Sequence, residues 1–309
     1  MSPRNVYLLL VFVSGILLIL NSCHKNNSNF STTNWKKEII EKRQNKDIEF
    51  KNSPTSPFAG LVRLTASNDR ENYLVYDEEN YHIATNKLKG ALLSIHWKQD
   101  QWLITSFDPE FKGLPSNETV NSESYPSNRT VCTYKKYTVL LYPLDDKFVI
   151  IVFDPEKKEL QEFQHLKYYP PEPDYRVFAE FQRFKNFQQV KMTTSQNQIK
   201  TFYRYAKMVF TLKDKKKFLI AYKTDLNQRP GEALLFIPFT DKTNGITTYP
   251  AGRFMEITEP VEDTFILDFN KVFNPLCNYS HVYNCPYPPA ENALDIPIEA
   301  GEKKYPVSH

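Results

Sequence analysis

The amino-acid sequence predicts a mainly β protein, with antiparallel sheets arranged as a sandwich or a barrel-like structure and one N-terminal amphipathic helix. From Ala59 onward, apolar and polar residues alternate in roughly a dozen or more short runs, which is the period of strands with one buried face. Asn, Asp, Lys and Pro separate these runs and supply most turns, because the chain has only eight glycines. The helical period occurs ahead of this region, so a single helix is expected.

The first 22 residues are predicted to be a signal peptide. Arg4 supplies the positive end, and the apolar run from Val6 to Leu20 has fifteen residues, whereas a membrane-spanning helix needs about twenty. The run ends in Leu20-Asn21-Ser22-Cys23, which resembles the lipobox of bacterial lipoproteins. This resemblance implies a diacylglycerol on the Cys23 sulfur, cleavage before Cys23 and acylation of the new amino terminus. The alternative is a plain anchor helix followed by an ordinary cysteine.

A lipid anchor at Cys23 predicts a protein held on a membrane of the bacterial cell envelope, because two or three acyl chains bind a bilayer stably. His24 follows Cys23 in place of the aspartate that favours inner-membrane retention, so the outer membrane is slightly favoured. Cleavage removes one positive charge, Arg4, from a formal total of +3, which leaves +2. A nearly neutral chain without a long basic run is not expected to bind nucleic acid.

The helix is predicted from the spacing of apolar residues after a polar segment. Residues 23–33 are rich in Asn and Ser, as expected of a tether. Asn34 is a suitable cap for a helix that begins at Trp35 and ends near Lys46. Trp35, Ile39 and Ile40 then fall on one face, which we expect to be buried.

Two β-rich regions follow from the composition of the chain. Residues 34–170 contain the helix and the first region, and residues 171–309 contain the second. The proline-rich stretch from Tyr168 to Pro173 is the best candidate for a junction between them. The two regions are also compatible with packing as one domain.

The strands are predicted from apolar runs bounded by turn residues. Ala91–Trp97 and Gln101–Thr105 flank a short polar turn and predict a hairpin, whereas Phe107–Ser127 carries three prolines and predicts a long loop. The other expected strands are Asn80–Ala84, Val131–Leu141, Phe148–Phe153, Tyr175–Phe184, Gln188–Thr194, Ile199–Tyr205, Met208–Leu212, Lys217–Tyr222, Leu234–Phe239, Arg253–Ile257 and Phe265–Phe269.

The second β-rich region carries a series of closely spaced motifs. They are Phe239-Thr240-Asp241-Lys242-Thr243 with Gly245, Thr248-Tyr249, Gly252-Arg253-Phe254, Asp268-Phe269-Asn270, Asn274-Pro275 with Cys277, Cys285-Pro286 with Pro288-Pro289, Asn292 and Leu294, and Ala300-Gly301-Glu302-Lys303. In this order they resemble the signature of a bacterial family catalogued as a domain of unknown function, DUF1684. A weaker likeness at Trp35, Arg43, Ser56-Pro57 and Gly60-Leu61 extends the resemblance over most of the chain. The family has no established activity, so the resemblance implies no mechanism.

Eight polar or aromatic residues of the second region are candidates for one ligand-binding pocket, because they flank neighbouring strands. They are Asp241, Thr243, Tyr249, Arg253, Asp268, Asn270, Asn274 and Asn292. Arg253 is suited to hold a carboxylate or phosphate through two hydrogen bonds. The alternative is structural: Asp and Asn close turns after strands, and Arg253 pairs with Asp241 or Asp268 inside the fold.

Cys277 and Cys285 are spaced eight residues apart, with His281 midway between them. Two nearby cysteines in an exported protein favour a disulfide, which would stabilise the chain by about 2–3 kcal/mol. A zinc site with His281 and Asp268 is the second interpretation, but structural zinc sites usually use closer cysteine pairs. Cys132 would then be a buried thiol in a strand.

Two classes of function are compatible with these patterns. The first is an envelope lipoprotein that binds a small anionic or carbohydrate ligand, or a protein, through a polar pocket in the C-terminal region. The second is a hydrolase, or a metal- or flavin-assisted enzyme, with Asp241 and Asp268 as acid and base. The sequence has no recognisable nucleophile, metal motif or cofactor loop, so no catalytic residue and no cofactor is assigned. This favours the binding protein.

Overall fold

The structure is a computed structural model of the chain. It describes residues 27–77, 80–98, 101–112, 118–121, 130–144, 147–226 and 234–305. The predicted signal peptide and Cys23 lie outside these residues. Within them, sixteen strands form three antiparallel sheets, and the predicted fold class, mainly β with one long N-terminal helix, is confirmed.

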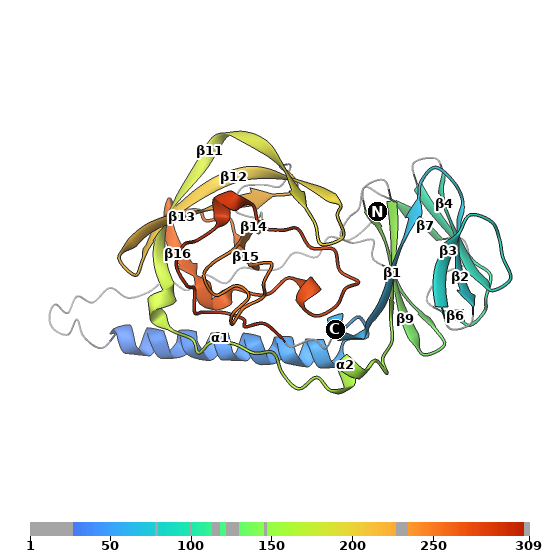
Figure 1. Cartoon of the computed structure of the whole chain (residues 1–309), viewed down its shortest axis with the longest axis horizontal. Helices are drawn as coiled ribbons and strands as arrows, with labels where there is room; N and C mark the ends of the chain where they lie inside the picture. Colours follow the sequence, from blue (N-terminus) through green and yellow to red (C-terminus); the bar gives the residue numbers. More distant parts are fainter. Residues whose placement is uncertain are drawn as a thin grey trace, which may run out of the picture.

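Two five-stranded sheets form a β-sandwich in the N-terminal half (Figure 1). The strand order in one is β1 (Gly60–Ser67), β10 (Lys147–Phe153), β9 (Tyr137–Leu144), β8 (Thr130–Tyr134) and β6 (Phe111–Lys112). The order in the other is β3 (Asn80–Ala84), β2 (Asn72–Asp77), β4 (Ala91–Lys98), β5 (Gln101–Ser106) and β7 (Glu118–Asn121). Their shared core includes fully buried Leu74, Trp102 and Phe148, because alternate residues of each strand point inward.

The hairpin predicted from Ala91 to Thr105 is confirmed as β4 and β5. The loop predicted from Phe107 to Ser127 is partly wrong, because β6 and β7 lie in it. The strand predicted at Val131–Leu141 is two strands, β8 and β9, joined by a turn in which Lys135 has a φ of 54°. The long apolar runs of β9 and β10 arise because both faces are buried: residues such as Val139 face the other sheet, whereas Tyr142 faces the C-terminal half.

The C-terminal half is built on a six-stranded antiparallel sheet. Its order is β15 (Arg253–Thr258), β14 (Leu234–Phe239), β13 (Lys215–Lys223), β12 (Ile199–Leu212), β11 (Arg176–Thr193) and β16 (Thr264–Asp268). The sequence predicts two strands in place of β11 and two in place of β12. Each is a single long strand whose pairing register shifts, in β11 between Arg183 and Gln188. Such irregularities interrupt the period of two and increase the curvature of the sheet, and β11 and β12 arch over this half in Figure 1.

Residues 269–305, named here the C-terminal segment, cover the open face of this sheet without adding a strand. The segment contains the short 3-10 helices η4 (Phe269–Lys271), η5 (Leu276–Asn278) and η6 (Ala290–Asn292). Its residues Leu294, Ile296 and Ile298 are buried in the main core against the sheet. The chain between β10 and β11 contains α2 (Lys158–Gln161) and η3 (Pro173–Tyr175), and the predicted junction lies against the segment, since Tyr169 N–H donates to Gly301 O at 2.9 Å.

Helix α1 (Asn27–Asn52) runs along the C-terminal half although it comes first in the sequence (Figure 1). It begins earlier and ends later than predicted, so Asn34 lies inside the helix and does not cap it. Trp35 and Ile39 are buried as predicted, but Ile40 is 45% exposed. The buried face continues to Phe50, which contacts Phe58 of η1 (Pro57–Ala59) in an aromatic cluster between the two halves.

The structure contains no transmembrane candidate among the helices of its described residues, since none combines sufficient length with sufficient apolar character. The apolar run from Val6 to Leu20 lies outside those residues.

Candidate functional site

Arg253, the central residue of the predicted pocket, is completely buried at the start of β15. Its guanidinium pairs with the Asp241 carboxylate at 2.7 Å, and both side chains are 0% exposed. The same guanidinium donates to the carbonyl oxygens of Ile298 at 2.7 Å and Ala300 at 2.5 Å. Arg253 therefore holds the C-terminal segment onto the sheet. This geometry matches the alternative interpretation from the sequence, in which Arg253 pairs with an aspartate inside the fold.

Asp241 also organises the loop that follows β14. Its Oδ1 accepts hydrogen bonds from the backbone N–H of Thr243 at 2.8 Å and from the Thr243 hydroxyl at 2.6 Å. That hydroxyl lies 2.8 Å from the hydroxyl of buried Thr248. This pattern is an Asx turn, in which a short polar side chain bonds to the backbone two residues on. Gly252 comes just before β15 and has a φ of 101°, a conformation that favours glycine. A side chain would not fit here, because an added Cβ would lie 2.7 Å from Phe239 O.

Asp268 and Asn270 form a second buried group, which binds helix α1. The Asp268 carboxylate accepts a hydrogen bond from the Trp35 indole at 2.7 Å, and its other oxygen accepts from Asn270 N–H at 3.0 Å. The Asn270 side chain bonds to both the N–H and the C=O of Glu172. This pair therefore attaches the helix and the chain leading into β11.

Asn274 belongs to a third buried group, centred on Glu302. The Glu302 carboxylate accepts from the Asn274 N–H at 2.8 Å, from the Tyr279 hydroxyl, and from Lys46 of α1. The Asn274 side chain donates to Lys303 O at 2.8 Å. Helix α1 and the C-terminal segment are thus joined by a buried acid that was not among the predicted site residues.

Asn292 lies between β13 and β14, which pair only at Tyr222 and Phe236. Its side-chain oxygen accepts from Ile220 N–H at 2.7 Å, and its amide donates to Ile220 O at 2.9 Å and Pro238 O at 2.7 Å. The side chain thereby replaces the missing rungs of the ladder, because unpaired buried backbone groups would be costly. Tyr249 is only partly buried, whereas the other seven predicted residues are buried and are held by hydrogen bonds within the fold.

The two cysteines of the C-terminal segment are free thiols in the structure, and no disulfide is present among the described cysteines, in contrast to the prediction. The Ser195 hydroxyl lies 3.1 Å from Cys277 Sγ and accepts from Cys285 N–H at 3.1 Å. A hydrogen bond from the Cys285 thiol lowers the pKa of Cys277 to about 7, and the same bond raises the pKa of Cys285. Burial, followed by the two neighbouring cysteines, raises the pKa of Tyr249 to about 12.

The described residues contain no group of three or more His, Cys, Asp and Glu side chains arranged to hold a metal ion. Asp268 is engaged with Trp35, and His281 is exposed. Cys132 is a buried thiol on β8, as predicted.

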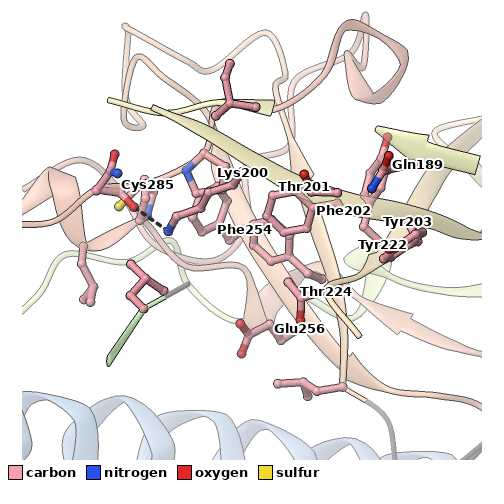
Figure 2. Close-up of a pocket in the computed structure, with 18 of the residues that line it drawn as sticks. Gln189, Lys200, Thr201, Phe202, Tyr203, Tyr222, Thr224, Phe254, Glu256 and Cys285 are labelled. Atoms are coloured by element: carbon pink, nitrogen blue, oxygen red, sulfur yellow. Dashed lines mark hydrogen bonds between the residues drawn. The ribbon is translucent and has the colours of Figure 1, made fainter. Parts of the chain in front are cut away.

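A large open cleft of about 1230 Å³ lies beside these groups, between the six-stranded sheet, the C-terminal segment and the end of β9. We call it the cleft. It is lined by Pro143, Leu144, Gln189, Ile199, Lys200, Thr201, Phe202, Tyr203, Tyr222, Thr224, Leu234, Phe236, Phe254, Glu256, Phe273, Pro275, Leu276, Asn284, Cys285 and Pro286. Of the predicted site residues that the structure describes, Cys285 alone lines it. Figure 2 shows Cys285 beside Lys200 toward one end and Glu256 beside Thr224 away from that end.

Aromatic side chains form a continuous row along the cleft. The ring centroids of Phe202 and Phe236 are 5.5 Å apart in a stacked pair, those of Phe236 and Phe254 are 4.8 Å apart, and those of Phe254 and Phe273 are 6.2 Å apart. Phe202, Phe236 and Phe254 come from β12, β14 and β15, and Phe273 comes from the C-terminal segment. An apolar ring or chain of a ligand would find matching surface here.

The charged residues of the cleft differ in their bonding. Lys200 Nζ donates to Asn284 O at 3.0 Å. Glu256 is exposed to solvent in the cleft and has no hydrogen-bond or ion-pair partner in the described part of the chain. The protein around its carboxylate partly removes it from water, which raises its pKa. One sequence signal was available for this residue: Glu256 is the charged interruption of the apolar run Phe254–Ile257. The adjacency of β12, β13 and β14, which creates the cleft, has no such signal.

Comparison with family models matches residues 161–303 to the model described as protein of unknown function DUF1684. An uncharacterized protein of Haloarcula marismortui, solved by NMR in solution, is similar to this chain at 33% sequence identity, covering 48% of this chain and 80% of that one, with a TM-score of 0.40. Comparison with curated proteins gives no match. The matched range contains every predicted site residue except Cys23.

Proposed function

The chain belongs to the DUF1684 family of proteins of unknown function, and we propose that it is a lipid-anchored envelope protein that binds a small molecule in the cleft of its C-terminal half. The observation that carries the binding proposal is the cleft itself, with about 1230 Å³ of space and a row of aromatic side chains along it. Ligand sites commonly enclose about 300–1,000 Å³ and combine apolar walls with a few polar groups.

The buried polar groups support this proposal by fixing the side of the cleft that the C-terminal segment supplies. Arg253 holds the segment at Ile298 and Ala300, and Glu302 holds it at Asn274. A ligand site needs walls that keep their shape, since ordering them on binding reduces affinity. In this proposal the residues of the family signature hold the wall of the cleft in place, and the ligand contacts the cleft residues beside them.

The enzymatic alternative is less well supported by the same contacts. Asp241 and Asp268 are buried, and each carboxylate already accepts hydrogen bonds from within the fold. A general acid or base must reach the proton that it transfers, and neither side chain lines the cleft. We therefore propose binding without chemistry at these two residues.

The location in the cell envelope rests on the lipobox resemblance at Cys23 and on the short apolar run before it. Acylation of Cys23 would attach the chain to a membrane just ahead of helix α1. The cleft would then bind a ligand from the envelope compartment into which the anchored protein extends.

The binding proposal is tested with Nile red, a neutral dye whose fluorescence rises in apolar surroundings. We expect saturable binding to the wild-type protein. Thr224 is exposed and lines the cleft, so Thr224→Trp should fill space and weaken binding at least about tenfold, which corresponds to roughly 1.4 kcal/mol. The matched control is Thr133→Trp, at an exposed strand position of the β-sandwich, which should bind the dye as the wild type does. Equal binding by Thr224→Trp, or no saturable binding by the wild type, would contradict the proposal.

A further inference from the structure

Glu256 lies in the middle of β15 with its side chain on the cleft side of the sheet. Its direct neighbour on β14 is Phe236, and Phe254 lies on the same side of β15, because alternate strand residues share a face. Solvent reaches Glu256 through the open cleft, yet the surrounding protein raises its pKa. Figure 2 shows Glu256 near Thr224, with no hydrogen bond drawn to its carboxylate.

Two other carboxylates of the C-terminal half, unlike Glu256, form ion pairs within the protein. Asp241 is paired with Arg253 at 2.7 Å. Glu259, three residues after Glu256, accepts from buried Lys223 at 3.2 Å and from other donors. A carboxylate removed from water is costly unless it is paired, and these two are paired. Glu256 differs from them because it is exposed to solvent in the cleft, where a ligand has room to pair with it.

We propose that Glu256 binds the ammonium group of a small organic cation, whose apolar part lies against Phe236 and Phe254. The inference rests on the proposed binding function and names the chemical class of the ligand. A carboxylate is the natural partner of an ammonium group, and a charge-assisted hydrogen bond is stronger than a neutral one. The aromatic rings beside it supply apolar surface for the rest of the ligand.

The positive groups near the cleft differ from Glu256 in their bonding. Lys200 donates to Asn284 O. Arg204 of β12, whose partner on β13 is Tyr222, pairs with Glu291 at 2.7 Å and donates to Gln188. Arg204 is therefore neutralised by a carboxylate, and Lys200 keeps its charge at the far end of the cleft from Glu256 (Figure 2). Glu256 is the cleft carboxylate that a cation can pair with.

The test compares two ligands of the same shape, 4-phenylbutylamine and 4-phenylbutan-1-ol, as competitors of Nile red. In the wild-type protein the amine should displace the dye at a concentration about tenfold lower than the alcohol, as expected for a hydrogen bond to a charged group. In Glu256→Gln the ratio of the two concentrations should fall to near one. The control Glu262→Gln, at an exposed position between β15 and β16, should keep the wild-type ratio.

The outcomes separate this inference from the proposed function. Saturable Nile red binding with equal competition by amine and alcohol would overturn the cation inference and leave the binding function standing. A preference for the amine that persists in Glu256→Gln would also overturn it. Equal competition in the wild-type protein overturns the inference without any variant, and Glu256→Gln is expected to fold because the residue is exposed. Absence of saturable dye binding would instead contradict the function on which the inference rests.

Discussion

Replacing Arg253 with Met should strongly destabilise the protein, because it removes the partner of a buried charge. The guanidinium donates to the Asp241 carboxylate and to the carbonyl oxygens of Ile298, Ala300 and Glu302. Met fills similar volume but leaves Asp241 buried without its cation. Breaking a buried pair in this way costs about 3–5 kcal/mol, a large share of the roughly 5–15 kcal/mol by which a domain is stable.

Equilibrium unfolding in urea, followed by tryptophan fluorescence and circular dichroism, measures this cost. The matched control is Lys37→Met on helix α1, because Lys37 pairs with Glu41 on the surface, with side chains 75% and 57% exposed. Such exposed pairs contribute about 0–1 kcal/mol. The double variant Arg253→Met with Asp241→Asn should cost less than the two single changes added together, since it removes the stranded charge.

A change of less than about 1 kcal/mol in the free energy of unfolding of Arg253→Met would refute this reasoning. It would show that water or another group reaches Asp241, and that the C-terminal segment is held mainly by its apolar residues. The same result would reopen the interpretation of Arg253 as a ligand-binding residue.

Three further predictions address the anchor, the thiols and the sheet. Cys23→Ala should prevent incorporation of radiolabelled palmitate in cells, because the thiol is the acylated atom; wild-type incorporation would exclude the lipoprotein proposal. Iodoacetamide should modify Cys277 at a rate that rises with pH and reaches half its plateau near pH 7, since its lowered pKa leaves more thiolate at neutral pH than the ordinary value of about 8.5 allows. A midpoint near the ordinary value, by peptide mass mapping, would contradict this. Asn292→Ala should lower the free energy of unfolding by about 1–3 kcal/mol, because it leaves buried groups of Ile220 and Pro238 without partners; an unchanged urea midpoint would be inconsistent with that role.

The strands that follow simple local rules were predicted correctly from the sequence. The β4–β5 hairpin has alternating apolar residues on both sides of a polar turn. Strands β11 and β12 were each divided in two, because shifts in register near Arg183 and Arg204 interrupt the alternation within one strand. Helix α1 continues past its predicted end near Lys46 because its buried face is completed by contacts with distant segments, as at Phe50.

The candidate site was harder to predict, since its geometry depends on contacts between residues far apart in the chain. The sequence predicts that Arg253 and Asp241 are able to pair. The carbonyl groups that accept the other hydrogen bonds of Arg253, however, lie more than forty positions away in the chain. Nothing in the local sequence indicates them. The cleft is likewise formed by strands and a segment that only the fold brings together, so Glu256 and the row of aromatic rings were not predicted.

A crystal structure of the protein soaked with Nile red tests the central proposal most directly, because it locates a bound molecule. We predict electron density for the dye in the cleft, against the rings of Phe236 and Phe254 and on the same side of the sheet as Glu256. Crystals of Thr224→Trp, soaked in the same way, should lack that density. Ordered dye elsewhere on the protein with an empty cleft in the wild type, or equal density in the two proteins, would contradict the assignment of this cleft as the binding site.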